Sequence, residues 1–265
     1  MLVIDELPIF LKRILRDPDG ARRVDEFLSW LRGVLQTLDS RSLVIVVSGS
    51  IGLRPLVERL GIPDRINHLD PLRLGPWSRE DSIECFERLS SSYELRLEGP
   101  IGAAVYDKLG IGIPHHVQTF FARLHDFAIM QGRGRVTVDD VAEVYDTALL
   151  GPAGLNDMVH YETRLQDGLD DESYSLAMEI LAEAATQEVF TPAARRSLEV
   201  LYTRVVQDAR PRTTHVLDVL VHDGYFEAAG DDHRFCSRLL KDWWSARFRY
   251  NHIPLVERLD TRDGN

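Results

Sequence analysis

The stretch Leu2-Val3-Ile4-Asp5-Glu6 opens the chain with a short apolar run that ends in two adjacent carboxylates. A second apolar run, Leu43-Val44-Ile45-Val46-Val47, ends in Ser48-Gly49-Ser50. Between the two runs, apolar residues recur at the spacing of an amphipathic helix over 24–38. Strand, helix and strand predict a right-handed βαβ unit with parallel strands. The unbroken apolar character of the second run is typical of a strand that is covered on both faces.

The polar residues that follow the two runs fall at one edge of this predicted sheet. Asp5 and Glu6 end the first strand, and Ser48 and Ser50 end the second. Ligands of open α/β sheets bind at the carboxyl ends of the strands, so the sequence predicts a binding site there. The alternative is that the two carboxylates only stabilise the positive end of a helix that begins near Pro8.

The remainder of the chain divides into further segments. Residues 65–69 are predicted to form a third strand. After Pro71 the pattern predicts helices only, until a polar connecting segment over 151–173 that we expect to be helical in part. From residue 174 on, three helices, the last at about 213–222, precede a β-hairpin. That order of elements is typical of a winged helix.

The composition narrows the class of protein. The chain has 265 residues, is 44% hydrophobic and carries a net charge of −11, which argues against non-specific binding to nucleic acid or to anionic membranes. Cys85 and Cys236 match no metal spacing and are expected to be reduced thiols of a cytosolic protein. No apolar run approaches the roughly 20 residues that span a bilayer, and Met1 leads into a strand rather than a signal peptide.

The order of these elements resembles the STAND branch of the AAA+-like P-loop ATPases, and its archaeal-type ATPases in particular. The resemblance rests on the Asp-Glu strand end, the Ser-Gly-Ser strand end, and Asp64-Arg65 at the third strand. Gly112-Ile113-Pro114 and Leu240-Lys241-Asp242-Trp243-Trp244 also fit. It covers most of the chain and implies an α/β fold with a partial P-loop NTPase parallel sheet, a helical lid and a C-terminal winged helix. The implied domains are the core at 1–75, the lid at 76–150, a linker at 151–173 and the winged helix at 174–265.

The resemblance assigns roles to the residues at the sheet edge. Asp5 would support Mg²⁺, and Glu6 would orient and deprotonate the water that attacks ATP. Ser48 and Ser50 would sense the γ-phosphate from the neighbouring strand. The implied cofactors are therefore ATP and Mg²⁺.

Other candidate residues have plainer alternatives. Arg65 would stabilise charge on a transferred phosphoryl group, or else form a surface salt bridge. The turn at Gly112 and Pro114 would approach the nucleotide, or else simply begin a helix. The pairs His115-His116 and His222-Asp223 lack a second ligand pair at a recognisable metal spacing, so the sequence favours solvent-facing or capping histidines.

The sequence departs from the resemblance at the phosphate-binding loop. That loop needs a Gly-Lys-Ser/Thr step, but the three lysines Lys12, Lys108 and Lys241 follow Leu, Asp and Leu. We therefore expect an ATP-dependent switch or regulator that lacks its phosphate loop and is inactive alone.

Two alternative functions remain open from the sequence. One is a non-catalytic interaction or regulatory module, and the other is a winged-helix DNA-binding regulator. The second is disfavoured because the candidate reading helix over 213–223 lacks Arg, Lys, Asn and Gln and carries Asp218 and Asp223. The sequence further predicts a protein partner or self-association, no membrane contact and a cytoplasmic location.

Overall fold

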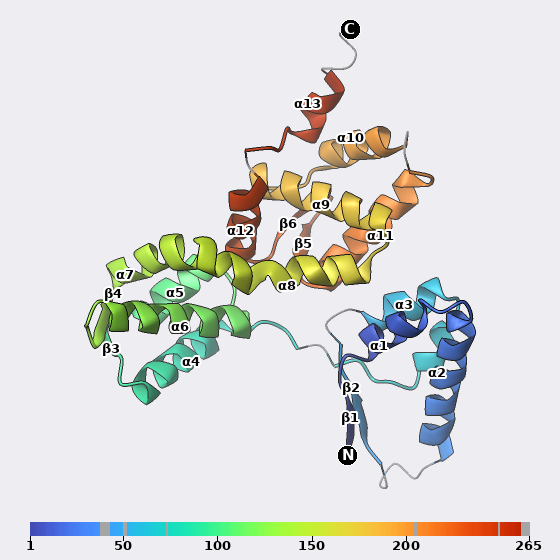
Figure 1. Ribbon diagram of the computed structural model, residues 1–265, viewed down its shortest axis with the longest axis horizontal. Helices are drawn as coiled ribbons and strands as arrows, with labels where there is room; N and C mark the ends of the chain where they lie inside the picture. The colour runs from blue at the N-terminus through green and yellow to red at the C-terminus, as the bar shows by residue number, and fades with distance from the viewer. Residues whose placement is uncertain (38–42, 50–51, 73, 204–205, 249, 261–265) are drawn as a thin grey trace. The chain divides into compact units, whose positions relative to one another are not determined.

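The computed structural model describes residues 1–37, 43–49, 52–72, 74–203, 206–248 and 250–260. The chain forms two compact units, Met1–Arg73 and Leu74–Asn265 (Figure 1). Within the described residues, no helix is both long and apolar enough to cross a membrane.

The first unit contains the predicted strand–helix–strand arrangement. Strands β1 (Leu2–Ile4) and β2 (Ile45–Val47) pair in parallel, which confirms the prediction of a parallel sheet. The helices of this unit are α1 (Leu7–Ile14), α2 (Gly20–Thr37) and α3 (Leu53–Arg59). Helix α2 buries Val24, Leu28 and Leu31, which share one face at helical spacing.

The described residues cover only one face of this two-stranded sheet. Ile4 and Val47 pack on the helical core that contains Leu7, Leu11 and Leu56. Val3 and Val46 on the strands are instead 54% and 43% exposed, and Val44, just before β2, is 56% exposed. The prediction of a strand covered on both faces is therefore wrong for the described part of the chain.

The predicted third strand over 65–69 is also wrong. Residues Pro63–Ile66 form a short 3₁₀ helix. The N–H of Leu69 then donates to the carbonyl of Ile66 at 3.0 Å. A strand needs a neighbour for its backbone hydrogen bonds, and among the described residues none lies beside this segment. Local hydrogen bonds take their place.

The second unit begins with a mainly helical half, which also holds two strands. Its elements are α4 (Arg79–Ser92), β3 (Arg96–Glu98), α5 (Ile101–Leu109), α6 (Pro114–Met130), β4 (Arg135–Thr137) and α7 (Val138–Val144). Strands β3 and β4 pair in parallel, so the prediction of helices alone was wrong. Three-residue strands are too short to show the alternation by which a strand is recognised.

A π-helical turn over Tyr145–Leu149 leads into the C-terminal half of this unit. The elements there are α8 (Pro152–Gly168), α9 (Asp171–Thr186), α10 (Pro192–Tyr202), α11 (Ala209–His222), β5 (Phe226–Ala229), β6 (Asp232–Phe235), α12 (Arg238–Phe248) and α13 (Leu255–Asp260). Helix α8 fills most of the predicted connecting segment, because Met158, Tyr161 and Leu165 bury one of its faces.

Helix α11 begins earlier than the sequence predicts. It starts at Ala209, and its first turn includes Arg210 and Pro211, where a missing N–H costs no hydrogen bond. The statement that this helix carries no cation is therefore wrong for its N-terminal turn. Strands β5 and β6 form the expected antiparallel hairpin directly after it.

One continuous hydrophobic core fills the second unit. It joins Phe86 and Phe120 of the first half to Leu176, Trp243 and Trp244 of the C-terminal half. Both tryptophans are buried.

Candidate functional site

The structure brings Asp5 and Ser48 together at the ends of the paired strands. The hydroxyl of Ser48 donates to the carboxylate of Asp5, which also accepts the N–H of Glu6 at 3.0 Å. The backbone holds these ends in register, because Ser48 N–H donates to Ile4 at 3.0 Å and Leu7 N–H donates to Ser48 at 3.1 Å. Ser50, which the sequence places at the same edge, lies outside the described residues.

Glu6 has an unusual backbone at this edge. Its φ of 53° lies in the left-handed region, and it occupies the N-cap of α1 without a side-chain capping bond. A non-glycine residue there costs about 1 kcal/mol or more of backbone energy. Strained residues cluster at functional sites, so the conformation is compatible with the predicted catalytic role. Its position directly before α1 also agrees with the alternative role, in which the carboxylate only stabilises the positive end of that helix.

Arg65 is held by neighbouring carboxylates. Its Nε donates to Asp25 at 2.7 Å and its Nη1 donates to Asp64 at 2.5 Å. The hydrogen bond to Asp25 is the main cause that raises the pKa of the Arg65 guanidinium. These contacts are the salt bridge that the sequence offers as the alternative role, and the two carboxylates balance the cation.

Gly112 and Pro114 lie in the second unit, apart from the other candidates in the chain. The N–H of Trp77 donates to the carbonyl of Gly112 at 2.7 Å. A Cβ on Gly112 would come within 2.3 Å of the Trp77 carbonyl oxygen, so this close approach requires glycine. Pro114 begins α6, as the helix-start alternative predicts.

The sheet edge offers some, but not all, of the oxygen ligands that a magnesium ion needs. Carboxylate and hydroxyl oxygens are ligands that Mg²⁺ accepts, usually beside several waters and the phosphates of a substrate. Asp5 and Ser48 supply one oxygen donor group each. In the described part of the chain, the sheet edge included, no cluster of three or more His, Cys, Asp or Glu side chains could hold a metal ion.

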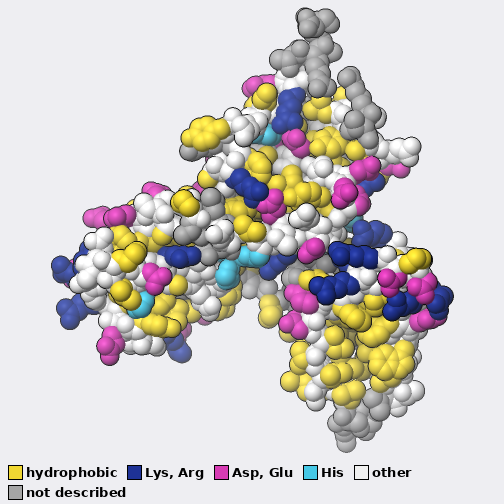
Figure 2. Space-filling view, in the orientation of Figure 1, with side chains coloured by type: hydrophobic (Ala, Val, Ile, Leu, Met, Phe, Trp, Pro, Cys, Tyr) yellow, Lys and Arg dark blue, Asp and Glu magenta, His cyan; other side chains and the backbone are white. Residues whose placement is uncertain are grey.

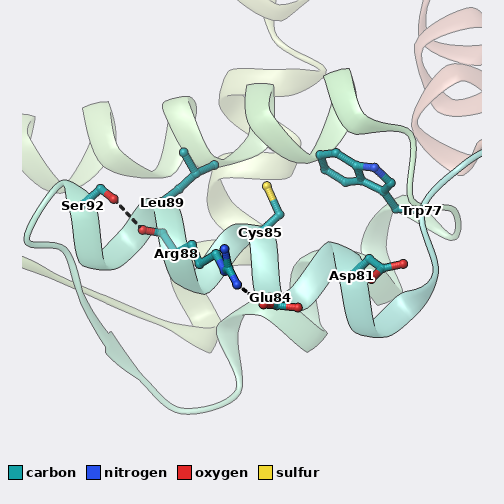
Figure 3. Close-up of a pocket in the computed structure, with 7 residues that line it drawn as sticks. All are labelled: Trp77, Asp81, Glu84, Cys85, Arg88, Leu89 and Ser92. Atoms are coloured by element: carbon teal, nitrogen blue, oxygen red, sulfur yellow. Dashed lines mark hydrogen bonds and ion pairs between the residues drawn. The ribbon is translucent and has the colours of Figure 1, made fainter.

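The structure also shows a groove that the sequence does not indicate. It has a volume of about 410 Å³ and runs along α4, lined by Trp77, Asp81, Glu84, Cys85, Arg88, Leu89 and Ser92 (Figure 3). Arg88 and Glu84 pair with each other at 2.6 Å. Burial raises the pKa of the Cys85 thiol, which makes it a poorer nucleophile. The lining therefore offers no catalytic set.

A second missed feature is a buried polar chain around His116. Its Nε2 lies 3.0 Å from the hydroxyl of Tyr161, and its Nδ1 lies 3.3 Å from the hydroxyl of Ser237. Burial lowers the pKa of His116 to about 3. The sequence could not reveal these partners, which lie 45 and 121 residues away.

Comparisons with known proteins identify the fold. No protein-family profile matches the sequence, and no curated protein does. The structure is similar to a Walker-type ATPase of Pyrococcus abyssi, with a TM-score of 0.55 and 14% identity over 91% of this chain. This chain covers 62% of that ATPase. Two variants of RuvB from Thermotoga maritima align over 77% and 80% of this chain, with TM-scores of 0.40 and 0.43 and identities of 14% and 16%. This chain covers 60% and 62% of those two proteins.

The likeness to the Pyrococcus protein shows a shared fold. The chain is therefore a mainly helical α/β protein with small parallel sheets, of the kind found in P-loop ATPases. It spans less than two thirds of the length of that ATPase.

Proposed function

We propose that this polypeptide belongs to an ATP-dependent switch of the STAND or AAA+-like type and does not hydrolyse ATP by itself. The observation that carries the proposal is the contact of Ser48 with Asp5 at the ends of neighbouring parallel strands. In a P-loop ATPase fold, that edge is where a nucleotide and its metal bind. The strained Glu6 beside it adds support.

The residues of this chain would act on a bound nucleotide in separate ways. Asp5 would hold Mg²⁺, which neutralises the charge of the phosphates when it is bound. Ser48, in contact with Asp5, would sense the γ-phosphate. Glu6 would accept a proton from a water molecule at its carboxylate. The chain contains no Gly-Lys step, so it lacks the cation and the backbone donors of a phosphate loop. A segment outside residues 1–265 would have to supply this cation and these backbone donors.

Within this proposal the second unit contains the lid at 76–150 and a winged helix in 174–265. The order α9, α10, α11 and hairpin supports the winged-helix assignment. The backbone of Phe190 also pairs with His233 of the hairpin through hydrogen bonds of 2.8 and 3.0 Å, which ties the start of α10 to the wing.

The test is equilibrium dialysis of radiolabelled ATP with Mn²⁺, in which the ATP retained with the protein measures binding. Weak binding of Mn²⁺ and ATP at millimolar concentrations is expected, because two oxygen donors remain at the sheet edge. Asp5→Asn and Ser48→Ala should each abolish it, whereas Asp70→Asn, an exposed aspartate of the same unit, should not. Binding that survives both substitutions would refute the site.

A non-catalytic interaction module is the second candidate function. It is favoured by the contacts of Arg65, which is neutralised by Asp25 and Asp64. No binding of Mn²⁺ and ATP in the same experiment would favour this candidate. We further propose that this module binds a protein partner or a second copy of itself. It would do so in the cytoplasm, without contact to membranes or nucleic acid.

A further inference from the structure

Helix α12 joins the two halves of the second unit. It packs against α9 and α8 of the C-terminal half and against α5 of the first half. Its two tryptophans, Trp243 and Trp244, are buried in the common core. Figure 1 shows α12 between the hairpin and the helices of the first half.

Two polar contacts from the N-terminal part of α12 bind it to the first half. The hydroxyl of Tyr145 donates to Asp242 at 2.7 Å, and Arg238 donates to the carbonyl of Asp107 at 3.0 Å. Burial and the bond to Asp242 raise the pKa of Tyr145 far above its ordinary value. The hydroxyl therefore remains a donor at any physiological pH.

A buried chain of side chains makes the same connection through the core. Ser237, just before α12, meets His116 of α6, which meets Tyr161 of α8. The hydroxyl of Tyr225 then donates to the carbonyl of Tyr161 at 2.6 Å. A displacement between the halves would leave these buried groups without partners, which is costly in a dry interior.

The covalent connection between the halves is also closely packed. A Cβ on Gly151 or Gly154 would lie 2.0 Å from the carbonyl oxygen of Thr147 or Leu149. Backbone packs directly on backbone at this bend, so both positions require glycine.

We propose that residues 76–150 and 152–260 form one rigid lever, in which a displacement of the first half is delivered to the hairpin and α13 without internal bending. This differs from a winged helix that moves independently of its lid. It does not depend on nucleotide binding, because every contact that supports it lies within the second unit.

The test is a distance measurement between spin labels on the full chain, without nucleotide. Cysteines at the exposed Met130 of α6 and Ala229 of β5 report across the two halves, in a Cys85→Ser, Cys236→Ala background. Labels at Met130 and Val138 provide a reference pair within the first half. A single distance population across the halves, as narrow as the reference, is expected. A broad or two-state distribution across the halves beside a narrow reference would refute the lever.

A double substitution then tests the contact between Tyr145 and Asp242. Tyr145→Phe with Asp242→Asn should widen the distribution across the halves and leave the reference unchanged. Tyr106→Phe, on the neighbouring α5, removes a hydroxyl that takes part in none of these contacts; it is the matched control and should change neither distribution. An unchanged width in the double variant would show that these contacts do not fix the halves.

Discussion

Glu6 shows how a single residue can combine local strain with a candidate function. Its left-handed backbone lies between β1, which ends at Ile4, and α1, which begins at Leu7. Glycine would adopt this conformation without strain, yet the chain has a carboxylate there. The side chain is therefore the feature to test.

Our first prediction is that the polypeptide alone releases phosphate from ATP at a negligible rate. Carboxylates repel phosphate unless a metal lies between them, and Asp5 and Glu6 cannot replace the missing lysine and loop. In a phosphate-release assay, the chain and its Glu6→Gln variant should give the same background. Robust turnover that Glu6→Gln abolishes would contradict the prediction.

His116 gives a second prediction at this scale, on the pH dependence of stability. Its pKa is about 3 in the folded chain and about 6.5 in an unfolded one. Between these values the unfolded chain binds the extra proton, so the free energy of unfolding should fall as the pH falls, by at most about 1.4 kcal/mol per pH unit from this group.

Urea unfolding at pH 7, 6 and 5 measures this effect. His116→Gln should show a smaller loss of stability over this range than the unaltered chain. His115→Gln, at the exposed neighbouring position, should keep most of the loss, because burial is the largest cause of the lowered His116 pKa and His115 a smaller one. Equal pH dependence in His116→Gln and the unaltered chain would exclude the buried neutral histidine as its source.

At the scale of elements, the sheet of the first unit is covered on only one face by the described residues. Parallel sheets are normally covered on both faces and have several strands. Here two strands of three residues pair with each other, and no described strand adds to either edge. The segment over 43–49 has no charged side chain that would discourage edge pairing.

We accordingly predict that the isolated chain is marginally stable or associates with itself through this sheet. Sedimentation velocity should show larger species as the concentration rises. Val46→Lys should reduce them by placing a charge on the uncovered face, whereas Val200→Lys, at an exposed valine of α10, should not. A strict monomer with a sharp, cooperative melt at high concentration would count against this.

Charge is distributed unevenly over the whole molecule. Residues 1–73 contain eleven Lys and Arg and ten Asp and Glu, whereas residues 74–265 contain twenty and thirty-two. The acidic surplus therefore belongs to the second unit. Figure 2 shows cations and carboxylates mixed on the visible face rather than a continuous basic surface.

The last prediction is that the chain does not bind duplex DNA. Helix α11 does contribute Arg210 and Arg212, but Arg212 is paired with Asp170 at 2.7 Å and Glu172 at 3.0 Å. Asp218 remains exposed on the same helix. Fluorescence anisotropy with random duplex DNA at low salt should show no binding at about 10 µM protein. Binding at that level that weakens steeply with salt, and that Arg210→Ala reduces, would favour the DNA-binding alternative.

The sequence by itself determined the strand–helix–strand core and the meeting of Asp5 with Ser48. Both follow from local periodicity and from the rule that parallel strands end at the same edge. The helix start at Pro114 was also readable, because proline at the start of a helix is a local signal.

Only the tertiary structure decided the features that depend on distant partners. Residues 65–69 are not a strand, because no described strand pairs with them. Strand β3 forms because it pairs with β4, whose residues lie 39 positions further along the chain. Arg65 forms a salt bridge, because folding brings a carboxylate oxygen of Asp25 within 2.7 Å of its Nε. Local pattern reports which face of a segment is apolar, but the partner of a strand edge or a charge is set by where the rest of the chain packs.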